Sequence, residues 1–207
     1  MTKPKKLTVH VVLDRSGSMQ SMKHDAIGAF NSYVEELAKT VPGSSLSLTL
    51  FDSQGVDTIV NDADIAKVVP LNASTFVPRG QTPLYDAIGK VTALLADAKG
   101  KNKALVILTD GHENASREYS RDAIKKLLDE KQEKDNWLVI YLGANQDAFA
   151  AGAAFGSQAA TTMNFASSGA GLRGAMGASA DATARYAMSS NRADATFSAA
   201  ERAKAAK

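Results

Sequence analysis

The chain has 207 residues, of which 44% are hydrophobic and 22% are charged, so it is long enough for one globular domain with a sizeable core. The formal net charge of +2 is too small to indicate nucleic acid or a membrane surface as a partner, and no apolar run approaches the roughly 20 residues of a membrane-spanning helix. The lack of cysteine excludes disulfides, thiolate metal sites and cysteine nucleophiles.

The first residues, MTKPKK, are basic, but the apolar run that follows them is too short for a signal peptide because Asp14 interrupts it. We therefore expect a cytoplasmic protein. An unrecognised secretion route or a virion location stays open.

The first predicted element is a strand over residues 7–13, whose near-continuous apolar run is typical of a strand that is buried on both faces. A polar, glycine-containing turn follows. Helical spacing of apolar residues then predicts a helix over residues 20–41, which a Pro-Gly pair ends. Alternation over residues 46–51 predicts a second strand, and residues 56–60 predict a third strand that pairs antiparallel at an edge.

The second half of the chain predicts alternating helices and strands. Thr82 and Pro83 are typical of a helix start, with a hydroxyl at the N-cap and proline at the first helical position. The elements that follow this helix are expected at 104–109 (strand), 116–134 (helix), 137–142 (strand), 143–155 (helix) and 161–165 (strand). This order predicts an α/β fold with a doubly wound, mostly parallel central sheet, one antiparallel edge strand and helices on both faces.

The last part of the chain differs in composition. We divide the sequence into a domain over residues 1–165 and an alanine-rich helical segment over residues 166–207, which has little aliphatic bulk. We expect this segment to pack at its start and to fray over about its last dozen residues.

Three glycines near the start of that segment formally match a dinucleotide-binding fingerprint. Gly169, Gly171 and Gly174 have the required spacing, and Asp194 lies about twenty residues on. No strand-forming residues precede Asp194, so the βαβ unit that such a fingerprint needs is missing. We interpret the glycines as a turn into a helix.

Oxygen-bearing side chains stand at the end of the first predicted strand. Asp14, Ser16 and Ser18 occupy alternate positions there, and Asp110 follows the strand predicted over residues 104–109. Open α/β sheets place their sites at the carboxyl ends of strands, and short oxygen ligands suit a hard cation such as Mg²⁺. The plainer alternative is that the two serines only cap the first helix.

The spacing Asp-x-Ser-x-Ser after a buried strand resembles the metal-ion-dependent adhesion site (MIDAS) of von Willebrand factor type A (VWA) domains. The stretch GQTPLYDAI, residues 80–88, resembles the threonine loop of that family. The stretch LVILTDG, residues 105–111, resembles the strand that carries its second aspartate. The three stretches stand in the family's order, and the resemblance covers roughly the first 145 residues well.

The resemblance implies a set of roles for five residues. Ser16, Ser18 and Thr82 would contact the ion directly, whereas Asp14 and Asp110 would act mainly through water and hydrogen bonds to those hydroxyls. Because neutral hydroxyls do not cancel the charge of the cation, a carboxylate from outside can complete its coordination. The implied function is a protein-binding module, not an enzyme. Its Mg²⁺, with Mn²⁺ or Ca²⁺ as alternatives, would capture an aspartate or glutamate of a protein partner.

Three other residues stand near this pattern. Asp86, one turn after Thr82, either supports the threonine or the ion from a second layer, or only favours the positive end of its helix. Arg15 is expected to face solvent, either as a plain exposed arginine or as a group that receives an acidic partner. A single histidine is poor evidence for zinc, so we expect His112 to make a contact at the rim of the site.

Two other functions stay open. Asp14 also occupies the place of the phosphoryl-accepting nucleophile in haloacid-dehalogenase-like enzymes, which would make the protein a metal-dependent phosphotransferase or hydrolase. That chemistry needs a second aspartate where this chain has Ser16. The family resemblance also suggests an accessory subunit of an ATPase-driven complex. The sequence does not predict the oligomeric state.

Overall fold

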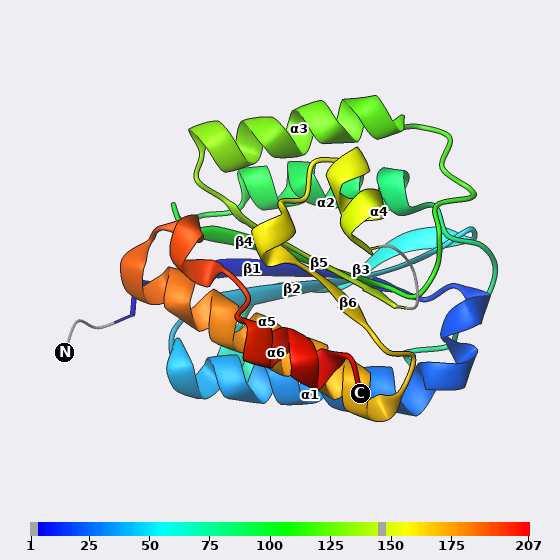
Figure 1. The fold of residues 1–207 in the computed structure, drawn as a ribbon, viewed down its shortest axis with the longest axis horizontal. Coiled ribbons are helices and arrows are strands. Elements are labelled where there is room, and N and C mark those ends of the chain that lie inside the picture. Colours follow the sequence, from blue (N-terminus) through cyan, green and yellow to red (C-terminus); the bar gives the residue numbers. More distant parts are fainter. Residues whose placement is uncertain (1–3, 145–147) are drawn as a thin grey trace.

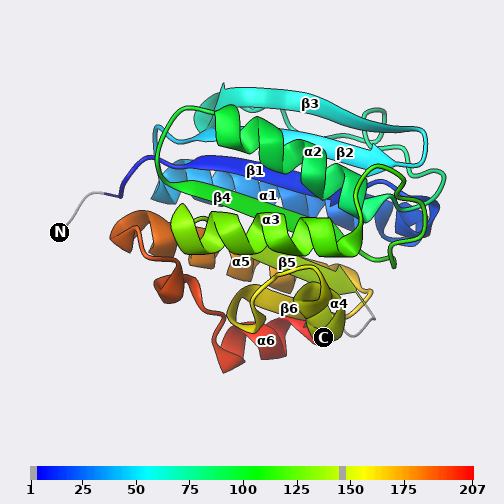
Figure 2. The same cartoon turned by 90° about the horizontal axis from the view of Figure 1, so that it is seen from above.

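The structure is a computed structural model that describes residues 4–144 and 148–207. Its centre is a six-stranded sheet in the order β3-β2-β1-β4-β5-β6. The strands are β1 (Thr8–Asp14), β2 (Ser45–Asp52), β3 (Gly55–Asp64), β4 (Lys103–Thr109), β5 (Leu138–Ala144) and β6 (Thr162–Phe165). All neighbours pair in parallel except β2 and β3, so the predicted sheet with one antiparallel edge strand is confirmed. Figure 2 shows β3 at one edge and β6 at the other.

Helices cover both faces of the sheet (Figure 1). One layer contains α1 (Lys23–Thr40), α5 (Gly169–Ser189) and α6 (Ala199–Ala205). The other layer contains α2 (Leu84–Asp97), α3 (Arg121–Lys134) and α4 (Ala148–Ala154). Short 3₁₀ helices lie at Gly17–Met22, Ile65–Lys67, Ala159–Thr161 and Arg192–Ala195. No helix in the described ranges is long and apolar enough to cross a membrane.

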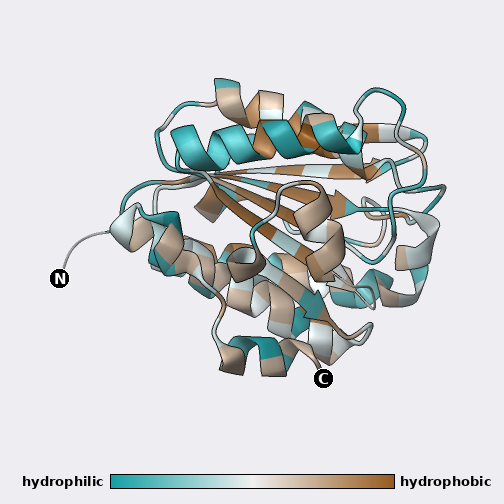
Figure 3. Ribbon diagram, turned by 45° about the horizontal axis from the view of Figure 1, so that its top comes forward, coloured by the Kyte–Doolittle hydropathy of each residue, from teal (hydrophilic) through white to brown (hydrophobic). Residues whose placement is uncertain are grey.

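Burial of the central strands on both faces explains their apolar runs. Every residue of β1, β4 and β5 is buried. Side chains alternate between the faces, so Val11 packs into the core below α1 and α5 while Val12 packs into the core below α2 and α3. In Figure 3 the strands are largely hydrophobic, whereas α3 turns a hydrophilic surface outwards.

Two predicted helix starts differ from the structure. α2 begins at Leu84 with Pro83 as its N-cap residue, so Thr82 is not the cap, and the first amides of the helix donate to Glu113 and Ser116 instead. α3 begins at Arg121 instead of residue 116, because Ser120 caps it by accepting a hydrogen bond from Ala123 N. The predicted helix over 143–155 corresponds to α4 in part, and its positions 145–147 lie outside the described residues.

The end of the chain forms a docked helix, α6, and the predicted fraying of its last residues stays a prediction. A capping box starts α6, in which Ser198 Oγ accepts from Glu201 N and the Glu201 carboxylate accepts from Ser198 N. Ala205 is fully buried, and its carbonyl accepts a hydrogen bond from Ala166 N at 2.9 Å. Arg202 Nη1 donates to the Thr162 carbonyl at 2.6 Å, which ties α6 to β6. Composition alone suggested a weak core here, but small side chains let this helix pack closely.

The glycine pattern after residue 168 serves that packing. A Cβ on Gly171 would lie 2.4 Å from the Ala166 carbonyl oxygen and 2.9 Å from that of Ala205. A Cβ on Gly174 would meet the Lys204 backbone at 2.9 Å. Both glycines lie inside α5 and not in a turn before it, so their role is the close approach of two helices.

Candidate metal site

The parallel pairing of β1 and β4 brings two aspartates together at the carboxyl edge of the sheet. Leu13 pairs with Leu108, so Asp14 and the residues after β4 emerge side by side. Asp14 is completely buried, whereas Asp110 is half-buried. The polar turn after β1 continues as the 3₁₀ helix Gly17–Met22, in which Ser18 is exposed.

A chain of hydrogen bonds links the predicted residues. Asp14 Oδ1 accepts from Ser16 N at 2.7 Å, and Asp14 Oδ2 accepts from Thr109 Oγ1 at 2.5 Å. The hydroxyl oxygens of Ser16 and Ser18 are 3.0 Å apart. Ser18 Oγ donates to Asp110 Oδ1 at 2.6 Å, so both aspartates belong to one network.

Thr82 reaches the same place from the loop before α2. Its backbone is held by Asn114, whose Oδ1 accepts from Thr82 N at 2.9 Å and whose N donates to the Thr82 carbonyl at 3.1 Å. A Cβ built on Gly111 would lie 3.1 Å from Thr82 Oγ1, 3.5 Å from Ser18 Oγ and 3.8 Å from Asp14 Oδ2. These three predicted oxygens lie close together on one side of Gly111, and because this residue has no side chain, an open point is left in front of it.

Backbone hydrogen bonds fix the two loops relative to each other. Gly17 N donates to the Gly80 carbonyl at 3.1 Å, and Arg79 N donates to the Arg15 carbonyl at 2.8 Å. Gly80 has a positive φ of 68°, and a Cβ there would lie 2.4 Å from Ser53 Oγ. A glycine is therefore required where the threonine loop passes the β2–β3 hairpin.

Both aspartates resist ionisation without a cation. Burial raises the pKa of Asp14 to about 6, although hydrogen bonds from Thr109 and Ser16 act against this rise. Burial also raises the pKa of Asp110, against the hydrogen bond from Ser18. A positive ion at the open point would favour the charged form of each carboxylate.

The prediction that Arg15 faces solvent is wrong. Its side chain is 8% exposed, and Nε donates to Asp52 Oδ2 at 2.6 Å while Nη2 donates to Asp57 Oδ2 at 2.7 Å. Arg79 Nε donates to the same Asp52 oxygen at 3.0 Å. This pairing could not be predicted from the sequence, because Asp52 and Asp57 meet Arg15 only through the β2–β3 hairpin. Burial disfavours the Asp52 carboxylate, but hydrogen bonds from Gln54 N and both arginines outweigh it and lower its pKa.

Asp86 and His112 take different places around the site. The Asp86 carboxylate accepts hydrogen bonds from Arg117 N, Glu118 N and Tyr119 N at 2.8, 2.9 and 2.9 Å. It therefore holds the loop before α3, and no hydrogen bond links it to Thr82 in the described structure. His112 is exposed beside Gly111, and its rim contact stays a prediction.

Sequence reasoning missed two residues that shape the site. Thr109 Oγ1 donates to Asp14 and accepts from Gly111 N at 3.0 Å, and Asn114 holds Thr82. Thr109 could have been suspected as the last residue of a buried strand, next to Asp110. Asn114 gave no signal, because its partner Thr82 lies 32 positions away.

The donor set fits a hard cation. Two carboxylates and three hydroxyls supply only oxygen, as Mg²⁺, Mn²⁺ and Ca²⁺ prefer. Within residues 4–144 and 148–207, no three side chains of His, Cys, Asp or Glu form a group that could hold a metal ion. A cation here would therefore depend on the serine and threonine hydroxyls.

Comparisons with solved structures show the same fold. The VWA-type protein from Catenulispora acidiphila has a TM-score of 0.62 at 13% identity, over 88% of this chain and 42% of that one. Proximal thread matrix protein 1 from the mussel byssus, in a structure with a zinc-occupied MIDAS motif, has a TM-score of 0.61 at 20% identity, over 85% and 47%. The vWF domain of the pilus tip protein Mfa5 from Porphyromonas gingivalis has a TM-score of 0.66 at 11% identity, over 86% and 95%.

The chain spans less than half the length of the first two of these proteins. No curated protein matches the sequence. The sequence model of the von Willebrand factor type A domain, however, matches residues 9–113, which is just over half of the chain. The matched range begins in β1, passes through the threonine loop and ends after Asp110. The chain therefore belongs to the von Willebrand factor type A domain family.

Proposed function

We propose that this VWA domain binds a protein partner through a divalent cation, with Mg²⁺ as the first candidate. The observation that carries the proposal is the convergence of Thr82 Oγ1, Ser18 Oγ and Asp14 Oδ2 on one side of Gly111, all within 4 Å of where a side chain would begin. Two further oxygen-bearing side chains, those of Ser16 and Asp110, are hydrogen-bonded to Ser18.

The family pattern implies a role for each residue. Ser16, Ser18 and Thr82 would contact the ion as neutral ligands. Asp14 and Asp110 would orient the hydroxyls as hydrogen-bond acceptors and supply negative charge nearby. A cation held in this way stays electrophilic and can accept one more oxygen ligand. An aspartate or glutamate of the partner is the ligand that fits, since a hard cation prefers an anionic oxygen.

The fold relatives include a pilus tip protein, a minor pilin and a byssus matrix protein, which favours a binding or structural role over catalysis. The cytoplasmic location expected from the sequence stays a proposal.

The alternative of phosphoryl transfer by Asp14 is disfavoured by geometry. The side chain has no exposed surface, and both its oxygens accept hydrogen bonds, from Ser16 N and Thr109 Oγ1. A nucleophile must reach a substrate phosphorus atom, and the position of a general acid is occupied by Ser16. An accessory role beside an ATPase remains compatible with a binding module.

Thermal unfolding tests the cation site. Ions at about one hundred times their Kd should stabilise the fold by about 2.7 kcal/mol, which raises the Tm by about 5–10 °C for a domain of this size. Ser18→Ala should abolish most of this shift, whereas Ser21→Ala should keep it. Both serines are exposed in the same short helix, so they form a matched pair. An equal Mg²⁺ shift in both variants would refute the site.

Affinity capture tests the binding function. Proteins retained on the immobilised domain in Mg²⁺ should be released by EDTA and should not be retained by Ser18→Ala. Removal of the responsible acid from an identified partner should abolish binding while the domain stays folded. A partner that binds equally well in EDTA would place the function on another face of the domain.

A further inference from the structure

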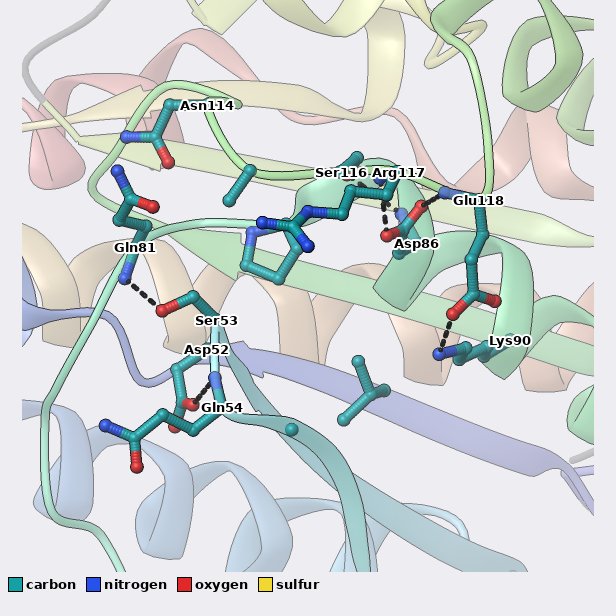
Figure 4. Close-up of a pocket in the computed structure, with 14 residues that line it drawn as sticks. Asp52, Ser53, Gln54, Gln81, Asp86, Lys90, Asn114, Ser116, Arg117 and Glu118 are labelled. Carbon is teal, nitrogen blue, oxygen red and sulfur yellow. Dashed lines mark hydrogen bonds and ion pairs between the residues drawn. The ribbon is translucent and has the colours of Figure 1, made fainter.

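A polar cavity of about 470 Å³, shown in Figure 4, is lined by neighbours of the metal-site residue Thr82. Its walls come from the β2–β3 hairpin, the loop before α2 and residues 114–118. Gln81 and Pro83 both line it, and Thr82 stands between them. Asn114, another lining residue, holds the Thr82 backbone. The cavity therefore lies next to the place where a partner segment would reach the cation.

The other charged groups in the cavity wall already have partners. Asp52 pairs with two arginines, and Glu118 accepts from Lys90 Nζ at 2.7 Å. Asp86 accepts three backbone hydrogen bonds. Of the charged side chains that line the cavity, all within the described residues, Arg117 alone has neither an ion pair nor a side-chain hydrogen bond.

The position of Arg117 is fixed although its side chain is free to bind. Its backbone N–H donates to Asp86 Oδ2 at 2.8 Å, and the next two backbone N–H groups bind the same carboxylate. Figure 4 shows the guanidinium group pointing into the cavity from this anchored loop. A change of the side chain leaves all three backbone hydrogen bonds available, so the loop should keep its shape.

We infer that the cavity receives a second acidic side chain of the partner, on the same segment as the acid that binds the cation. This inference rests on the proposed function. A guanidinium group pairs with a carboxylate through two parallel hydrogen bonds. Ser53, Gln81 and Asn114 add uncharged polar groups for the backbone between the acids.

Peptide selection tests this preference. The probe is a displayed library of seven-residue peptides with a fixed central aspartate and random flanks, bound in Mg²⁺ and eluted with EDTA. The wild-type domain should enrich aspartate or glutamate at a defined second position in the flanks. Arg117→Glu should replace this preference by lysine or arginine. Arg121→Glu is the matched control, because Arg121 is exposed in the first turn of α3 and does not line the cavity.

Affinity measurements with selected peptides make the test quantitative. Arg117→Ala should reduce the affinity for a peptide with two acids by about threefold to tenfold, the range for a partly exposed ion pair with paired hydrogen bonds. The same peptide with serine in place of the second acid should bind wild type and Arg117→Ala equally. Mg²⁺ should raise the Tm of Arg117→Ala as much as that of the wild type, since Arg117 does not touch the cation.

The outcomes separate this inference from the function it builds on. Peptides that elute with EDTA but show no second acid, or keep it with Arg117→Glu, would overturn the inference and leave the metal-dependent binding intact. If no peptide is released by EDTA, the inference and the proposed capture of an acidic residue both fail.

Discussion

Replacing Asp14 with asparagine should stabilise the metal-free protein at neutral pH, although it alters a candidate metal-site residue. Asparagine keeps the shape of the side chain, and its Oδ1 can still accept from Ser16 N, as Asp14 Oδ1 does at 2.7 Å. Thr109 Oγ1 lies 3.1 Å from the Gly111 carbonyl and can donate its hydrogen there. It can then accept from the new amide, so no buried polar group loses its partner.

The size of the effect follows from the pKa of Asp14. Burial raises this pKa from 3.8 to about 6, and each pKa unit corresponds to about 1.4 kcal/mol. Because the folded-state pKa is raised, the stability that Asp14 contributes is fully present below the unfolded-state pKa and is lost as the pH rises through about 6. The wild type should lose about 3 kcal/mol over this window, and Asp14→Asn should not.

Urea denaturation in EDTA at several pH values between 4 and 7.5 measures this difference. The stability of Asp14→Asn relative to wild type should grow with pH and level off above the pKa of Asp14. Asp122→Asn, which changes an exposed carboxylate of α3, should show no such trend. In Mg²⁺ the wild type should regain the advantage. A stability difference that does not change with pH would refute the raised pKa and the physical argument built on it.

Two structural predictions concern the surroundings of the site. Asp86→Ala should lower the free energy of unfolding by about 3 kcal/mol, and the three loop amides that Asp86 binds should then exchange hydrogen rapidly. Asp97→Ala, at the exposed end of the same helix, should cost little stability. Equal exchange in both variants would contradict the assigned role. Gly171→Ala should lower the free energy of unfolding by about 1–3 kcal/mol through overpacking and should make residues 199–205 accessible to trypsin. Gly177→Ala, with nothing within 4 Å of its Cβ, should be neutral or stabilising. Protection of α6 from trypsin in both variants would show that the close approach is not needed.

Periodicity predicted the fold because the sheet strands obey it strictly. The apolar runs of β1 and β4 reflect burial on both faces, and each ends in the polar residues that begin the site. The positions of Asp14 and Asp110 followed from strand polarity alone, and the structure brings both to one edge. The metal-binding role of these residues stays a prediction, which the chemistry of the donor set supports.

Long-range partners explain what the sequence could not predict. Arg15 looked like an exposed arginine because Asp52 and Asp57 stand 37 and 42 positions away. The close packing of the last helix, α6, could not be predicted for a related reason. Alanine and glycine contribute little hydrophobic area each, but they let α5 and α6 approach to backbone contact. Composition measures side-chain bulk and not this fit, which depends on both helices at once.

The electrostatics of the site link folding to the proposed binding. Burial makes both Asp14 and Asp110 harder to ionise, so the metal-free site is held in an unfavourable charge state at neutral pH. A cation would relieve this cost, and part of its binding free energy would appear as stability of the fold. The hydroxyls of Ser18 and Thr82 add no charge of their own. The ion would therefore keep enough positive charge to attract one more carboxylate, whereas several carboxylate ligands from the domain itself would neutralise it.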